Sequence, residues 1–137
     1  MRALLDTNVI MDALQERRPL DVEAKEILRR GQGGEIDLLF TANAATDIFY
    51  LYSKARGKKS ARSAIGFLLN TYDVADVTHE ACVNALSIPI ENFEDALVAE
   101  CAKTAGADYI VTRDTGFQNS ASPVAAIGPA SFLDLLK

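Results

Sequence analysis

The sequence predicts an α/β fold: a three-layer α/β/α sandwich around a central, mostly parallel twisted sheet of four to five strands. Two observations favour this fold. Short apolar runs of strand length alternate with longer segments whose apolar residues recur at helical spacing, which is typical of parallel sheets covered by helices. At 137 residues, 49% of them hydrophobic, the chain can bury one core and is short for two. We therefore expect a single domain over residues 1–137.

Five segments have the length and apolar character of buried strands. Each is bounded by polar residues, glycine or proline, which mark turns. The expected strands are residues 2–6, 36–41, 72–77, 108–112 and a short fifth at 124–127.

Helices are expected between these strands, with ends set by capping residues. Pro19 and Pro129 fit first helical turns, Thr78 and Asn92 are suitable N-caps, and Gly106 ends a helix. The expected helices are residues 7–14, Pro19 to the glycines at 31–34, 43–56, 58–71, 79–86, 93–105 and 129–137. The expected buried stripes are Val22, Ile27 and Leu28 in the second helix and Ala44, Ile48, Leu51 and Ala55 in the third. The small polar residues after Asp114 predict a loop.

Acidic residues follow two of the strands. Asp6 ends the first strand, and Asp114 follows the fourth. Glu94 and Asp95 open a helix, where a helix N-terminus alone would account for an acid. That explanation does not cover Asp6 and Asp114. Because ligands bind at the carboxyl ends of parallel strands, we expect Asp6, Asp95 and Asp114 to share one crevice.

Such a crevice suits a hard metal ion. Carboxylates held close together repel one another unless a proton or a cation joins them. Oxygen ligands without nearby histidine or thiolate favour Mg²⁺ or Mn²⁺ over zinc. An ion of this kind fits phosphodiester hydrolysis, since it polarises the phosphoryl group and lowers the pKa of an attacking water.

Basic residues concentrate in one stretch of an otherwise acidic chain. The formal net charge is −5 at pH 7, yet residues 54–62 carry no acid. The basic side chains there are Lys54, Arg56, Lys58, Lys59 and Arg62. A solvated helical corner and a phosphate-facing patch are equally good interpretations of this cluster.

Other classes of site and location find less support. His79 is the only histidine and has no triad partners, which argues against a serine or cysteine hydrolase. Cys82 and Cys101 lie in helical patterns without paired metal spacing, as small buried hydrophobes do. No apolar run approaches a membrane span, and Asp6 interrupts the start before a signal-peptide core can form. We expect a cytoplasmic protein without a membrane association.

Three segments resemble the signature segments of the PIN-domain family. They are LLDTNVIMD at 4–12, FEDALVAECA at 93–102 and GADYIVTRDTGF at 106–117. They occur in the family's order and cover nearly the whole chain. The sequence is similar to the VapC-like toxin ribonucleases of bacterial and archaeal type II toxin-antitoxin systems.

The resemblance implies a metal-dependent endoribonuclease that forms a homodimer and is inhibited by a cognate antitoxin. Asp6, Asp95 and Asp114 would hold one or two Mg²⁺ (or Mn²⁺) ions. Asp47, where the family usually has a longer glutamate, would orient a water for attack on RNA. Asn8 and Thr112 would support the acids by hydrogen bonds, and Glu94 would assist. The resemblance also gives the five basic side chains of residues 54–62 a role in binding RNA, together with Arg113 near the cut site.

Alternatives stay open at this point. A PIN nuclease could process RNA as a housekeeping enzyme, since an antitoxin gene is not visible in one sequence. A degenerate module could bind RNA or protein without cutting. A haloacid-dehalogenase-type phosphohydrolase also begins with a strand ending in aspartate and could use Thr112, but it needs an acid where Asn8 stands.

Overall fold

The computed structural model describes residues 1–137 as strands alternating with helices. The strands are β1 (Arg2–Leu5), β2 (Asp37–Thr41), β3 (Asp73–Ala75), β4 (Tyr109–Val111) and β5 (Ala126–Ile127). The helices are α1 (Thr7–Leu14), α2 (Asp21–Gln32), α3 (Ala42–Arg56), α4 (Lys58–Thr71), α5 (His79–Ala85), α6 (Phe93–Thr104), α7 (Thr115–Gln118) and α8 (Pro129–Leu135). The alternation expected from the sequence is therefore present along the chain.

The five strands form one sheet in the order β3-β2-β1-β4-β5, and every pairing is parallel. The chain builds outward from β1 through β2 to β3, then crosses to the other side of β1 to add β4 and β5. The carboxyl ends of β1 and β4 therefore form the topological switch point, where open α/β sheets bind ligands. Leu5 pairs with Val111, so the residues that follow, Asp6 and Thr112, emerge side by side.

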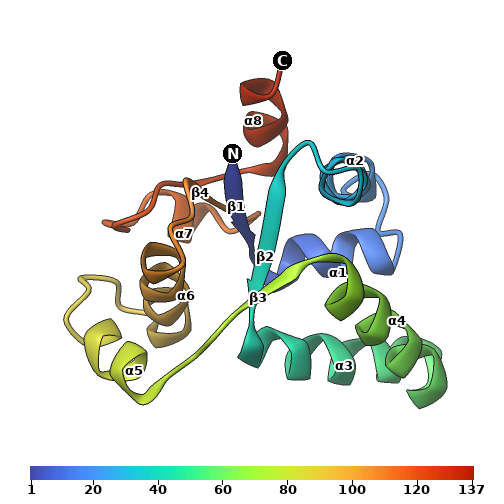
Figure 1. The fold of residues 1–137 in the computed structure, drawn as a ribbon, viewed down its shortest axis with the longest axis horizontal. Helices are drawn as coiled ribbons and strands as arrows, with labels where there is room; N and C mark the ends of the chain where they lie inside the picture. Colours follow the sequence, from blue (N-terminus) through green and yellow to red (C-terminus); the bar gives the residue numbers. More distant parts are fainter.

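Helices cover both faces of this sheet (Figure 1). On one face, α1 to α4 and α8 pack over a core that includes Phe40, Ile48 and Phe132. On the other face, α5, α6 and α7 pack over Leu39 and Ile110. The predicted three-layer sandwich with a parallel sheet is confirmed.

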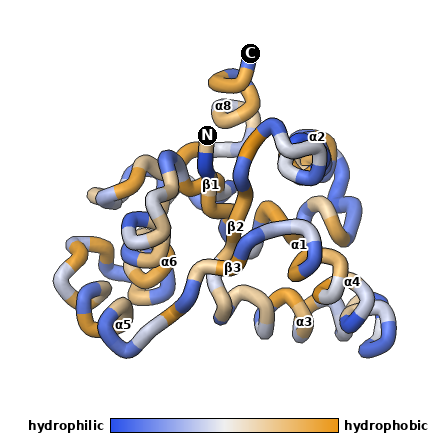
Figure 2. The backbone as a smooth tube through the Cα atoms, in the orientation of Figure 1, coloured by the Kyte–Doolittle hydropathy of each residue, from blue (hydrophilic) through white to orange (hydrophobic).

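Helices α3 and α4 form a hairpin, residues 42–71, that extends to one side of the sheet (Figure 1). They join at Gly57, whose φ of +88° is a conformation that residues with a side chain rarely adopt. Hydrophobic residues follow the central strands, whereas hydrophilic residues gather at the outer tip of this hairpin (Figure 2). None of the helices has the length and apolar character required to span a membrane.

Two expected buried stripes were partly wrong. Val22 is 61% exposed, because the inner face of α2 is formed by Asp21, Ala24, Ile27 and Leu28. The buried carboxylate of Asp21 is paired with Lys25 at 3.2 Å, which helical periodicity of apolar residues does not reveal. In α3 only Ala44 and Ile48 are buried, whereas Leu51 and Ala55 are exposed since the helix runs beyond the sheet.

The residues after Asp114 form a short helix, α7, where the sequence predicted a loop. Asp114 caps this helix, since its Oδ1 accepts a hydrogen bond of 2.9 Å from the Gly116 N–H. Phe117 is 1% exposed and anchors the turn to the core. A four-residue helix has too few residues for a recognisable apolar period, so capping and one aromatic anchor decide it.

Candidate active site

The pairing of β1 with β4 places Asp6 and Thr112 side by side at the centre of the site. Asp6 N–H donates to the Val111 carbonyl at 2.9 Å, which extends the β1–β4 ladder by one residue. Directly beside it, the Thr112 hydroxyl donates to Asp6 Oδ2 at 2.8 Å. Thr112 is fully buried, so its hydroxyl is shielded from water and this bond fixes the Asp6 carboxylate firmly.

Asn8 connects the first turn of α1 to the end of β4. Its side-chain nitrogen donates to Thr112 Oγ1 at 3.3 Å and to Asp6 Oδ2 at 3.4 Å. Its side-chain oxygen accepts the Arg113 backbone N–H at 3.2 Å, and the Asp114 N–H donates to Thr112 Oγ1 at 3.1 Å. Asn8 and Thr112 therefore hold Asp6 and Asp114 in one hydrogen-bonded network, as expected of supporting residues.

The remaining acids come from the opposite face of the sheet. Asn92 caps α6, accepting the Asp95 N–H at 3.1 Å, and this places Glu94 and Asp95 in the first turn. Asp6 likewise caps α1, where its Oδ1 accepts the Thr7 N–H at 2.9 Å. The partial positive charge at the starts of these helices favours carboxylates there.

These residues line one open pocket of about 350 Å³ at the switch point. Its lining consists of Asp6, Thr7, Asn8, Met11, Arg17, Leu51, Asn92, Glu94, Asp95 and Asp114. The structure thus brings together Asp6, Asp95 and Asp114 with the supporting residues Asn8 and Glu94. Thr112 lies buried beneath them. Asp47 is exposed on α3 and does not line the pocket.

The pKa values of three pocket acids are raised, first by burial and then by the neighbouring negative charges. Burial raises the pKa of Asp95 to about 6, and the charges of Asp6, Asp114 and Glu94 add to the rise. Burial also raises the pKa of Asp6, against the opposing effect of its hydrogen bonds from Thr112 and Thr7. The pKa of Glu94 is raised by burial and then by the charges of Asp47 and Asp6, so Asp47 acts on the rim of the pocket.

The donor set suits a hydrated divalent cation. All candidate ligands are carboxylate oxygens, and no three His, Cys, Asp or Glu side chains are close enough together to enclose an ion by themselves. Mg²⁺ keeps several of its waters and commonly uses only one or two carboxylates. An ion bound partly through water therefore fits Asp6, Asp95 and Asp114.

One buried carboxylate beside the pocket was missed in the sequence. Asp12 is 1% exposed and holds Arg113 through two hydrogen bonds, Nε to Oδ2 at 2.7 Å and Nη2 to Oδ1 at 3.2 Å. Arg17 lies 3.5 Å from the same carboxylate. An acid between Met11 and Ala13, inside an apolar helical run, is the signal that could have identified it, because buried charges need partners.

The predicted RNA-binding residues occupy two kinds of position. The five basic side chains of residues 54–62, here called the basic cluster, are all exposed on the α3–α4 hairpin. Leu51 lines the pocket from the same helix, and a rise of about 1.5 Å per residue places Lys54 and Arg56 about 5 and 8 Å further along its axis. Arg113, in contrast, is engaged by Asp12 next to the pocket.

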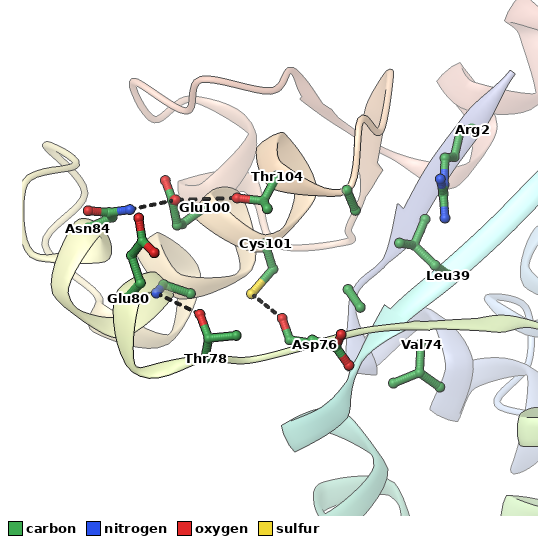
Figure 3. Close-up of a pocket in the computed structure, with 13 residues that line it drawn as sticks. Arg2, Leu39, Val74, Asp76, Thr78, Glu80, Asn84, Glu100, Cys101 and Thr104 are labelled. Carbon is green, nitrogen blue, oxygen red and sulfur yellow. Dashed lines mark hydrogen bonds between the residues drawn. The ribbon is translucent and has the colours of Figure 1, made fainter.

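A second pocket, of about 410 Å³, lies between β2, β3, α5 and α6 (Figure 3). Its buried acid Glu100 accepts hydrogen bonds from Asn84 at 3.3 Å and Thr104 at 3.4 Å. The Cys101 thiol donates to the Asp76 carbonyl at 3.7 Å (Figure 3). None of the predicted catalytic, metal-binding or RNA-binding residues lines it, so the acidic pocket at the switch point is the candidate active site.

Comparisons with known proteins agree with this architecture. The family model described as PIN domain matches residues 2–116. Ribonuclease VapC1 of Aquifex aeolicus is 26% identical over 121 residues, which cover 85% of this chain and 83% of that protein. This chain is similar to the DNA-bound VapBC structure of Salmonella typhimurium (TM-score 0.71, 14% identity, 94% of this chain and 98% of that one). It is also similar to VapC20 of Mycobacterium tuberculosis, a sarcin-ricin loop cleaving toxin (TM-score 0.68, 15% identity, 84% of this chain and 92% of that one).

Fold and site together define an α/β protein with an acidic, oxygen-lined pocket at the switch point of a parallel sheet. The chain belongs to the PIN-domain family. The resemblance noted in the sequence is therefore confirmed. The PIN-domain family takes the place of the haloacid-dehalogenase-type alternative.

Proposed function

We propose that this protein is a metal-dependent endoribonuclease and the toxin of a toxin-antitoxin pair. One observation carries the proposal: Asp6, Asp95 and Asp114, from three separate parts of a PIN-family chain, line one pocket at the switch point. The names of the relatives support it, since they include a ribonuclease and a toxin that cleaves the sarcin-ricin loop. With RNA as substrate, the protein acts in the cytoplasm.

Asp6, Asp95 and Asp114 would hold Mg²⁺ or Mn²⁺, with Glu94 assisting from the rim. Such an ion, when bound, would lower the pKa of a water and offset the negative charge that develops on the phosphate. Thr112 and Asn8 keep the Asp6 carboxylate oriented through the bonds at 2.8 and 3.4 Å. Asp47, exposed and outside the lining, would orient a water rather than serve as a direct ligand of the ion.

The RNA backbone is held by the basic cluster on the α3–α4 hairpin, because its five cations face solvent. Arg113, anchored by Asp12, provides a further positive charge beside the pocket. A strand in the pocket would cross Leu51 and continue toward Lys54 along α3.

Protein partners are also part of the proposal. Several solved relatives are VapBC complexes, from Salmonella typhimurium and Rickettsia felis among others, which supports an antitoxin as partner. Exposed apolar side chains offer surface for an antitoxin and for a second copy of the chain. They include Tyr50 at 60%, Phe67 at 41%, Val83 at 52%, Leu86 at 75% and Phe93 at 46% exposure.

Cleavage of RNA by the purified chain tests the catalytic part. A mixed set of structured and single-stranded RNAs is incubated with Mg²⁺, with Mn²⁺ or with chelator, beside Asp95→Asn and Asp76→Asn. Asp76 is a matched control, since it also follows a strand but lies outside the acidic pocket. We expect metal-dependent internal cuts that only Asp95→Asn abolishes. Binding without cutting under every condition would support the non-catalytic module instead.

Growth of a bacterial host tests the toxin part. Expression of the wild-type chain should arrest growth, whereas expression of Asp95→Asn at the same level should not. Cleavage in vitro without growth arrest would favour the housekeeping nuclease.

A further inference from the structure

We propose that Arg17 binds a phosphate of the substrate inside the acidic pocket, and that Asp12 positions it there. Arg17 is absent from the residues that sequence patterns identified. The inference rests on the proposed function, because it assumes that an RNA strand occupies this pocket.

Arg17 is the only cationic side chain that lines the pocket, among four carboxylates. Those carboxylates repel a phosphodiester until positive charge offsets them. The basic cluster on the α3–α4 hairpin lies outside the lining, so it does not offset the charge of the acids within the pocket. A guanidinium in the wall is therefore the protein's own means of holding the substrate where the acids act.

The backbone after helix α1 turns in a way that places Arg17 in the pocket wall. Helix α1 ends at Leu14, and Glu16 adopts a positive φ of 52°, which turns the backbone back toward the helix. The Arg17 N–H then donates to the Asp12 carbonyl at 3.1 Å. On the side chain, Nε donates to Gln15 Oε1 at 2.8 Å, so the guanidinium is held from two directions.

The charges around Asp12 do not cancel. One carboxylate, 2% exposed, faces two guanidinium groups: Arg113 through two hydrogen bonds, and Arg17 at 3.5 Å. Arg113 alone would neutralise Asp12, so Arg17 adds one surplus positive charge. Both arginine side chains are 39% exposed, which leaves donors accessible to a ligand.

Asp12 also keeps Arg17 away from the pocket acids. The structure gives Arg17 no ion pair with any carboxylate of the lining, and its Nη2 makes no hydrogen bond. Without Asp12, the guanidinium could collapse onto these acids and occupy the site itself. Asp12 is therefore a positioning residue, and Arg17 is the group that touches substrate.

Binding of a short labelled single-stranded RNA of mixed sequence, measured in chelator over a range of salt, tests this without cleavage. Arg17→Gln should weaken binding by roughly tenfold and reduce the slope of log K against log salt by about 0.7, as expected for one lost phosphate contact. Arg17→Lys should recover part of the affinity and the slope. Arg18→Gln is the matched control, since Arg18 is the exposed neighbour outside the pocket and should bind as wild type does. Asp12→Asn should reproduce the reduced slope while the protein stays folded in urea titrations.

The outcomes separate this inference from the proposed function. If Arg17→Gln and Arg18→Gln bind RNA alike, with equal salt slopes, the role of Arg17 is wrong even if the wild type cuts RNA. If Arg17→Gln weakens binding but the wild type never cuts, the phosphate contact stands and the nuclease proposal falls. If the wild type binds no RNA in chelator, the role of Arg17 is wrong; if it also cuts no RNA with metal, the nuclease proposal falls as well.

Discussion

The acidic pocket and the tip of the α3–α4 hairpin are built in opposite ways. Around the pocket, Asp6, Asn8 and Thr112 are joined by side-chain hydrogen bonds that span more than 100 residues of sequence. At the tip, the basic cluster makes no salt bridge. Of its side chains, Lys54 alone makes a side-chain hydrogen bond, in which its Nζ donates to the Tyr50 hydroxyl at 3.3 Å and lies 5.1 Å from the centre of the Tyr50 ring. Side chains in the acidic pocket are therefore held in one geometry, whereas the cationic side chains at the tip are free to change conformation.

This difference indicates a division of labour. Groups that take part in chemistry must be held in one geometry, so they sit at strand ends and helix starts supported by buried partners. Groups that hold a flexible polyanion need charge more than geometry. Substitutions in the pocket should therefore affect turnover strongly, and substitutions at the tip should affect affinity weakly.

The largest effect is expected for Asp6→Asn. Asparagine keeps the shape and the N-cap of α1 but removes the charge that would bind a cation. Loss of several kcal/mol of transition-state stabilisation corresponds to about a 10³-fold lower cleavage rate. Single-turnover kinetics would measure it beside Asp37→Asn, which changes an exposed carboxylate at the amino end of β2, away from the strand ends that carry the pocket. Equal rates for the two variants would remove Asp6 from the reaction.

Thr112→Val should show that the pocket depends on its buried support. Valine fills the same volume but removes the hydroxyl that bonds Asp6 and the Asp114 N–H. Leaving these groups unpaired should lower the free energy of unfolding by about 1–3 kcal/mol. Misorientation of Asp6 should also reduce cleavage by roughly tenfold. Thr112→Ser, which restores the hydroxyl, should recover both in urea titrations and rate assays.

The raised pKa values in the pocket predict an unusual dependence of stability on pH. An acid whose pKa is higher in the folded protein than in the unfolded chain destabilises the fold above that pKa. The penalty disappears as pH falls toward the unfolded value. Since the pKa of Asp95 is raised from 3.8 to about 6, and those of Asp6 and Glu94 are raised too, the metal-free protein should become more stable as pH falls from 7 to 5.

Urea midpoints measured across that range in chelator would check the trend. Asp95→Asn should flatten it, because the largest of these shifts is gone. The cleavage rate should change in the opposite direction to stability. It should decline below about pH 6, since a protonated Asp95 binds cations poorly. A midpoint that rises with pH in the wild type would mean that the pKa values of Asp95, Asp6 and Glu94 are not raised in the folded protein.

The sequence predicted the pocket better than its surroundings. Strand ends and helix starts are local signals, and parallel strands bring their carboxyl ends to one edge, so Asp6, Asp95 and Asp114 could be expected to meet. Thr112 and Asn8 were identified only through the resemblance to a family. Whether Asp47 belongs to the pocket depends on how α3 is rotated against the sheet, which helical spacing alone did not decide.

The missed residues are those whose roles depend on distant partners. Asp12 is paired with Arg113, which is 101 residues away, and a single sequence gives no sign of that pairing. Arg17 depends on a positive φ at Glu16, a residue type that gives no turn signal. Leu51 was assigned to the core because apolar periodicity cannot tell a helix face on the sheet from one bordering a pocket. Val22 was assigned to it because the same periodicity does not show which apolar residues face solvent.

The smallest effects are expected at the tip of the hairpin. Lys58→Gln and Lys59→Gln should each weaken RNA binding by about two- to threefold and lower its salt dependence, because each removes one solvated phosphate contact. The maximal cleavage rate and the urea midpoint should not change, since neither lysine has a partner in the fold. Lys103→Gln, at the exposed end of α6, is the control for loss of a lysine elsewhere. Equal affinities for all three variants would make the basic cluster an ordinary solvated corner and leave Arg17 and Arg113 as the cations that meet RNA.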